Sequence, residues 1–320
     1  MKSLTILSAL LLAGFAAADP IKTDILTLTE DFYLEDLVVY TGENEITNIV
    51  VPLNSINFND HTDLENFDVY VFFVEADKGL YVLKNNAATK VLDNGKDVAS
   101  SMDDSTQVFI GATDGIYTFN AEKKTAEKYG TLTDNIKNIL VTNGTDEIFI
   151  LTEDKVFYKV TEGGTKKEEI TNVKDAIQVV LDPLNNLYFV DSKKHVYVKS
   201  FEDGTVRKVK GVPANPKFVE LLRPPAIVDD GVPLISGKKV YDVHANATAE
   251  FTGLILNSKP SAYAVEATLV LYFAHDKKIY QYSVVDIINS TAEMMGQVKS
   301  FIEDKAPQVK EAAQKKSIRL

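Results

Sequence analysis

A two-part apolar pattern that returns about every 40 residues constrains the fold of this chain more than any other feature. In TQVFIGATDGIYTFN (106–120) two short apolar runs flank a polar turn, and the outline recurs five times. The first run is centred on Tyr70, Phe109, Phe149, Tyr188, Leu234 and Tyr272, at intervals of 39, 40, 39, 46 and 38 residues. The second run carries an aromatic residue in every copy: Tyr81, Tyr117, Phe157, Tyr197, Tyr241 and Tyr280.

The composition of these runs indicates strands. They alternate in twos and are rich in Val, Ile, Tyr and Phe, whereas ankyrin, TPR and HEAT units of similar period are helical. Each copy also contains two weaker strands, such as 137–144 before the first run and 166–172 after the second. Four strands in each of six copies predict an all-β fold, a six-bladed β-propeller of four-stranded blades.

A spare strand at the N-terminus can complete the last repeat, which is one strand short. The last copy lacks a fourth strand, and a spare strand at 33–42 precedes the first copy. Closing the ring with this N-terminal strand removes open sheet edges, which otherwise promote aggregation. The fifth copy is the longest, and the stretch RPPAIVDDGVP (223–233) predicts an irregular loop there.

The segments outside the repeats predict export and a helical tail. Residues 1–18 have the form of a secretory signal peptide, with Lys2, an apolar run and small residues before a cleavage point after Ala18. The apolar run is too short for a comfortable membrane span. The propeller then occupies 19–288, and the apolar spacing in 289–320 predicts a C-terminal helical tail.

Net charge and residue composition indicate which kinds of partner and chemistry this chain disfavours. The formal net charge of −12 at pH 7 disfavours binding to nucleic acid and to anionic membranes. The chain has no Cys, which excludes thiolate chemistry and disulfides. Sequons for N-glycosylation stand at Asn143, Asn246 and Asn289. With the signal peptide they predict a secreted, extracellular glycoprotein.

Motifs for catalysis or metal binding are missing from the sequence. The four His have no zinc-site spacing, and His195 and His275 are interpreted as solvated turn residues. We therefore predict no catalytic residue, no metal ligand and no enzyme activity. A propeller can still assemble a site from single residues on separate blades, which leaves a metal-dependent, lactonase-like hydrolase as an alternative. That hydrolase needs Asp, Glu or Asn from several inner strands. A second alternative is an extracellular protein-interaction or structural module.

A ligand site is predicted where the innermost strands meet the axis. The segments DNIKNIL, DAIQVVL, NPKFVEL and PSAYAVE bring Asn138, Gln178, Phe218 and Tyr263 near the channel. Lys238 and Lys277, in turns before aromatic strands, add positive charge to the same predicted face. In the competing interpretation these axial side chains merely plug the channel, and the turn lysines are ordinary solvated residues.

Residues 112–141 (ATDGIYTFNAEKKTAEKYGTLTDNIKNILV) resemble the insect ommochrome-binding proteins. The likeness includes a DG-aromatic turn, a following AEK segment and an NI that enters the next inner strand. It implies a secreted haemolymph carrier of tryptophan-derived pigments, with a bound pigment as its only expected non-protein group and no other cofactor. Such pigments are flat and often carboxylated, so the resemblance implies a small aromatic, acidic ligand.

Overall fold

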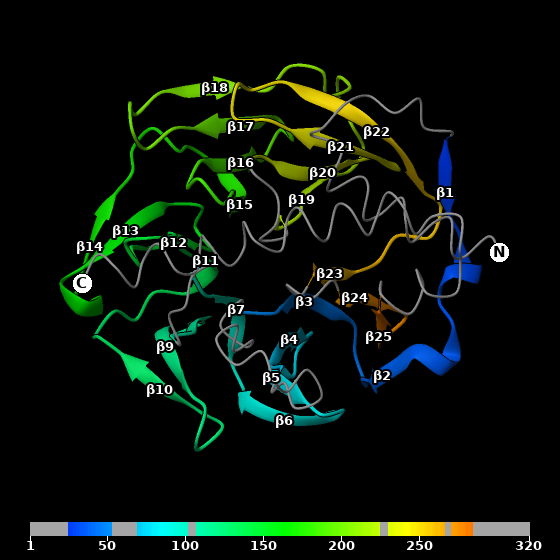
Figure 1. Ribbon diagram of the computed structural model, residues 1–320. Coiled ribbons are helices and arrows are strands. Elements are labelled where there is room, and N and C mark those ends of the chain that lie inside the picture. The colour runs from blue at the N-terminus through cyan, green and yellow to red at the C-terminus, as the bar shows by residue number, and fades with distance from the viewer. Residues whose placement is uncertain (1–24, 53–68, 102–106, 225–229, 266–269, 284–320) are drawn as a thin grey trace, which may run out of the picture.

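The residues described by a computed structural model form six sheets around one axis (Figure 1). These residues are 25–52, 69–101, 107–224, 230–265 and 270–283. The prediction of an all-β, six-bladed propeller with four-stranded repeats is confirmed. The predicted signal peptide at 1–18 and the predicted helical tail at 289–320 lie outside the described residues.

The first four blades are each made of four consecutive antiparallel strands, and the first strand of each lies innermost. Blade one contains β3 (Ile46–Val50), β4 (Val71–Glu75), β5 (Gly79–Lys84) and β6 (Ala87–Leu92). Blade two contains β7 (Gly95–Ala99), β8 (Phe109–Ala112), β9 (Gly115–Asn120) and β10 (Thr125–Tyr129). Blade three contains β11 (Ile136–Val141), β12 (Ile148–Thr152), β13 (Phe157–Thr161), the short 3-10 helix η4 (Glu162–Gly164) and β14 (Lys166–Glu169). Blade four contains β15 (Ala176–Leu181), β16 (Leu187–Asp191), β17 (Val196–Lys199) and β18 (Val206–Lys208).

The N-terminal residues complete the last two blades. Blade five contains β19 (Val219–Leu221), β20 (Val232–Ser236), β21 (Lys239–Val243) and β22 (Ala249–Leu256), and β1 (Leu26–Leu28) pairs parallel to β22. Blade six contains β23 (Ala262–Val265), β24 (Val270–His275) and β25 (Lys278–Ser283), and β2 (Val38–Thr41) pairs antiparallel to β25. The predicted closure by an N-terminal strand is therefore confirmed, and β1 is an additional fifth strand that the repeat did not predict.

The second aromatic series falls on the third strand of every blade. Tyr81 and Tyr197 stack on Phe73 and Phe189 of the preceding strands, with ring centroids 5.3 and 5.0 Å apart. Rings of this size remove a large apolar area from water, and stacked pairs add a further attraction of about 0.5–1.5 kcal/mol each. The repeated aromatic residue thus marks a packing position inside each blade.

Hydrophobic clusters fill the spaces between neighbouring blades. In one of them Phe149 and Phe157 of blade three pack with Val179 and Leu187 of blade four, and all four side chains are buried. Equivalent clusters join blades one and two, two and three, four and five, and six and one. A blade buries its faces only against its neighbours, so closing the ring adds to the stability of every blade.

The segment between β1 and β2 straps the N-terminus to blades five and six. It contains two short 3-10 helices, η1 (Glu30–Phe32) and η2 (Glu35–Leu37). Phe32 is fully buried and stacks on Tyr282 of β25 with ring centroids 4.6 Å apart. His275 stacks on Tyr33, and its Nε2 lies 2.9 Å from Oε2 of Glu30. The prediction that His275 is a solvated turn residue is therefore wrong, because the strap covers it.

Candidate functional site

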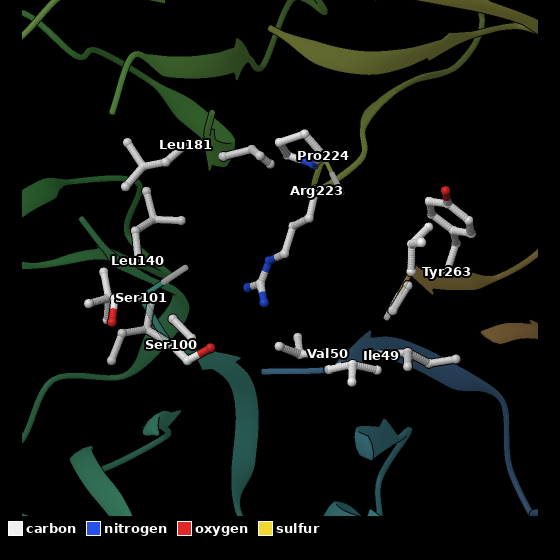
Figure 2. Close-up of a pocket in the computed structure, with 16 residues that line it drawn as sticks. Ile49, Val50, Ser100, Ser101, Leu140, Leu181, Arg223, Pro224 and Tyr263 are labelled. Carbon is white, nitrogen blue, oxygen red and sulfur yellow. The ribbon is translucent and has the colours of Figure 1, made fainter. Parts of the chain in front are cut away.

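A cavity of about 110 Å³ lies on the propeller axis, at the carboxyl ends of the innermost strands (Figure 2). We call it the channel-mouth pocket. Every blade contributes to its lining, through residues 49–51, 99–101, 139–141, 180–181, 223–224 and 263–265. The next residues of four inner connections, 53–68, 102–106, 225–229 and 266–269, lie outside the described residues.

The wall of the channel-mouth pocket is mainly aliphatic, with a few polar groups. Ser100, Ser101 and Tyr263 add hydroxyl groups, and Arg223 extends from the end of β19 toward the middle of the cavity (Figure 2). Burial raises the pKa of the Tyr263 phenol, so that group stays protonated and neutral. Apolar walls with a few placed polar groups are the usual composition of a small-molecule site.

A buried polar cluster joins this pocket to blade two. Asp97 of β7 is fully buried, and Nη2 of Arg223 lies 2.6 Å from its Oδ1. Nη1 of Arg223 donates to the carbonyl oxygen of Val98. Asn48 and Asn138, from the inner strands on either side, each donate from Nδ2 to the same carboxylate. We call Asn48, Asp97, Asn138 and Arg223 the axial cluster.

Irregular strand register explains why these side chains reach the axis. In β3, β7, β11 and β15 the pairing with the second strand skips one residue, and the residue after the skip is polar: Asn48, Asp97, Asn138 and Gln178. A bulge re-aims one side chain and frees a backbone N–H from the ladder. Asp97 Oδ2 accepts from the N–H of Ile139, and Gln178 Oε1 accepts from the N–H of Leu221. Asp97 and Gln178 thus satisfy backbone groups of the next blade, whereas Asn48 and Asn138 donate to the Asp97 side chain.

The axial cluster bears on the hydrolase alternative. A carboxylate and two amides from three inner strands do converge, as a metal-dependent hydrolase would require. The two oxygens of Asp97, however, accept from five N–H groups, of Asn48, Val98, Asn138, Ile139 and Arg223. The cation that pairs with the Asp97 carboxylate is the Arg223 guanidinium. Among the described residues, no group of three or more His, Asp or Glu is placed to hold a metal ion.

Two predicted site residues lie on the inner strands and connect blades. Asn138 donates to Asp97 across 3.2 Å, and its buried Oδ1 has no donor among the described residues. Gln178 makes two bonds to the backbone of Leu221, through its Nε2 at 2.7 Å and its Oε1 at 2.8 Å. The plugging interpretation agrees with both sets of contacts.

The other predicted residues are divided between the two faces of the propeller. Tyr263 lines the channel-mouth pocket and packs against Phe273. Phe218 precedes β19 at the opposite end, where its carbonyl oxygen accepts from Gly237 in the same turn as Lys238. Lys277 occupies the corresponding turn of blade six. The structure therefore does not bring Phe218, Lys238 and Lys277 together with Tyr263. The prediction placed all four residues on one face of the propeller, whereas Tyr263 lies on the face where the inner strands end and the other three lie on the face where those strands begin.

Lys238 and several other lysines near that opposite face have partners. Ion pairs join three of them to carboxylates: Lys78 to Glu43, Lys155 to Asp175 and Lys278 to Glu35. Lys238 donates to Oδ1 of Asn257, and Lys259 lies over the Phe218 ring at 4.1 Å from its centroid. Neighbouring carboxylates neutralise much of the positive charge, which weakens the case for an anion-attracting ring there.

Ser258, His275 and Glu30 gather at the strap but do not form a nucleophilic relay. In a Ser-His-acid triad the hydroxyl and the carboxylate bind opposite ring nitrogens. Here Nε2 of His275 lies 3.4 Å from Oγ of Ser258 and 2.9 Å from Oε2 of Glu30. Oγ of Ser258 also donates to Glu30. The carboxylate competes for the nitrogen that a catalytic serine would need, so the cluster holds the strap.

Sequence reasoning missed Asp97, Asn48 and Arg223. Asp97 and Asn48 occupy the same position after the bulge as the predicted Asn138 and Gln178, so aligning the inner strands of all copies would have found them. Arg223 opens the irregular stretch 223–233, where the repeat gives no register. Its partner is 126 residues away.

Comparison with known proteins supports the fold and carries no functional assignment. No family model and no curated protein matches this sequence. The extracellular domain of BT4673 from B. thetaiotaomicron is similar in structure, with a TM-score of 0.50 and 8% identity over 78% of this chain and 42% of that one. U3-55K has a TM-score of 0.50 and 11% identity, over 74% of this chain and 76% of that one. This chain thus spans less than half of the first of these proteins. No described helix has the length and apolar character needed to cross a membrane.

Proposed function

We propose that this chain is a secreted, non-catalytic binding protein that carries a small aromatic carboxylate in the channel-mouth pocket. The observation that supports this most is the pocket itself, an aliphatic cavity to which all six blades contribute and into which Arg223 extends. Aliphatic walls favour a flat apolar ring, and the guanidinium favours an acid. The proposal places the ligand at the end of the channel opposite Phe218, Lys238 and Lys277.

The size of the cavity limits how such a ligand binds. Cavities of about 150 Å³ hold a molecule of the size of benzene, and drug-sized ligands occupy about 300–1,000 Å³. A cavity of about 110 Å³ is smaller than either and takes only one edge of a flat ring system. An ommochrome, the ligand class that the sequence resemblance implies, would enter by one edge. Smaller tryptophan-derived acids with one or two rings would leave less of the molecule outside the cavity.

A titration with two matched aromatic variants tests this location. Kynurenate, xanthurenate and xanthommatin are titrated into the protein while absorbance or fluorescence is followed. Tyr263→Ala removes a pocket wall and should weaken binding about fivefold or more, whereas Phe218→Ala, on the other face, should leave it unchanged. Ser100→Phe, which fills the cavity from the end of β7, should also weaken binding and removes no core side chain.

The outcomes separate the alternatives. Loss of binding in Phe218→Ala alone moves the site to the opposite face, and no binding of any acid to the folded wild type refutes the carrier proposal. A hydrolytic activity abolished by EDTA would instead favour the hydrolase. Export is tested separately: secreted material should begin at Asp19, and a cytosolic chain with Met1 intact would contradict it.

A further inference from the structure

We infer that the unbonded edge of the Arg223 guanidinium is the carboxylate subsite of the channel-mouth pocket. This inference rests on the proposed function and goes beyond it by assigning the group that recognises the acid. The subsite would select monocarboxylates attached to a flat ring and would discriminate against their neutral amides.

The first argument is the way Arg223 is bonded. A guanidinium carries five N–H donors in one plane. Nη1 donates to the carbonyl oxygen of Val98 and Nη2 to Oδ1 of Asp97. No residue within the described ranges accepts from Nε, and the side chain is 29% exposed. Donors therefore remain on the edge that is not turned toward blade two, and Figure 2 shows the side chain in the middle of the cavity.

The second argument is the environment of Asp97, the nearest negative charge. Its side chain is 0% exposed, and backbone and amide N–H groups occupy its oxygens beside the guanidinium. N–H groups of the inner strands therefore offset the negative charge of Asp97, and the Arg223 guanidinium is the charged group that faces the cavity. A second carboxylate on the cavity side can then bind the same cation.

The third argument is preorganisation. Two contacts to blade two fix the guanidinium across the axis, so a ligand does not need to order a long flexible side chain. The aliphatic wall lowers the local dielectric constant, which strengthens a charge-assisted hydrogen bond. In this arrangement Asp97 is a positioning residue, and Arg223 is the residue that contacts the ligand.

Each acid is compared with its own primary amide, which keeps the ring and removes the charge. Kynurenate and its amide are titrated into the wild type and into Arg223→Gln at the same ionic strength. The wild type should bind the acid about tenfold or more tightly than the amide, as expected for a hydrogen bond to a charged group. Arg223→Gln should lose that preference and keep its affinity for the amide.

Lys277→Gln provides the matched control, because it changes the net charge equally on the opposite face and should leave the preference for the acid intact. If Arg223→Gln does not fold, the ratio of acid to amide affinity in the wild type still tests the inference, and Arg223→Lys, which keeps the charge but not the planar pair of donors, should lower that ratio. A wild-type ratio near one, or an unchanged ratio in folded Arg223→Gln, overturns it while the carrier proposal stands. Failure of both acid and amide to bind the wild type overturns the carrier proposal itself.

Discussion

Nη2 of Arg223 lies 2.6 Å from Oδ1 of Asp97, and this ion pair connects blade five to blade two across the axis of the propeller. The two blades occupy opposite positions in the ring of six (Figure 1). This direct contact between opposite blades crosses the channel beside the channel-mouth pocket, which Arg223 also lines. It also makes the stability of the ring depend on one buried carboxylate.

Replacing that carboxylate should be costly. Asp97→Ala leaves Arg223 without its counter-ion and several N–H groups without an acceptor, so the free energy of unfolding should fall by about 3–5 kcal/mol. Urea unfolding followed by circular dichroism measures the change. Glu127→Ala is the control, because the Glu127–Lys123 pair is exposed and such surface ion pairs contribute little to stability. Equal small losses in both variants would show that the axial pair is unimportant for folding.

The Asp242 carboxyl should make the free energy of unfolding depend on pH. Burial, with Glu250 directly opposite on β22, raises the pKa of the Asp242 carboxyl to about 7. The unfolded chain releases this proton near pH 4 and the folded chain only near pH 7. Because the unfolded state binds fewer protons in that window, this group lowers stability as pH rises from 4 to 7.

Asp242→Asn removes the titration. The variant should be more stable than the wild type at pH 8 by up to about 4 kcal/mol, and should show little gain at pH 4. Thermal or urea unfolding at the two pH values measures both differences. Glu250→Gln should give a smaller gain of the same sign, because it removes only the opposing charge. A gain that is the same at pH 4 and pH 8 would contradict the buried-acid explanation.

The N-terminal strap should be essential for a closed ring. Deleting residues 19–45 removes β2 and Phe32, leaves β25 as an open edge and should cause aggregation, visible by light scattering. Phe32→Ala alone should cost about 3–5 kcal/mol, because the ring is fully buried. Deleting residues 19–28 removes only β1 and should be milder. A soluble 19–45 deletion with unchanged stability would mean that the ring closes in another way.

The two described sequons should differ in occupancy. Asn246 is exposed, and its Oδ1 accepts from the N–H and the hydroxyl of Thr248 at 2.9 and 2.6 Å. Asn143 is partly buried, and its Nδ2 donates to the carbonyl oxygen of Pro183 in the next blade. A glycan on Nδ2 of Asn143 would break that link, so we expect the sugar on Asn246. Asn289 lies outside the described residues.

Mass spectrometry of protein secreted by eukaryotic cells checks this expectation. Asn246→Gln should remove the glycan mass at that position. Asn143→Gln should leave the mass of the attached sugar unchanged and should lower stability, since it disturbs the contact between blades three and four. A glycan found on Asn143 of folded material would refute the argument.

Local patterns in the sequence determined the architecture. The alternation of apolar residues has the two-residue period of a strand, and the aromatic residues of the second series all lie on third strands, from Tyr81 on β5 to Tyr280 on β25. The spare strand before the first copy and the missing strand in the last predicted the pairing of β2 with β25. These features depend on neighbours in the chain or on a fixed spacing, so they can be recognised without coordinates.

Only the tertiary structure decided what meets at the axis. Aligning the inner strands finds the polar residues Asn48 and Asp97, but the bulges that turn these side chains toward the axis are single-residue changes of register that such an alignment does not show. Arg223 reaches Asp97 because a ring of six blades places blade two opposite blade five. Tyr263 and Phe218 were predicted to share one face, but Tyr263 of β23 lines the channel-mouth pocket, whereas Phe218 precedes β19 beside the turn that contains Lys238. The sequence by itself determined the strands and their number, while the closing angle of the ring and the register of each inner strand decided which side chains form the pocket.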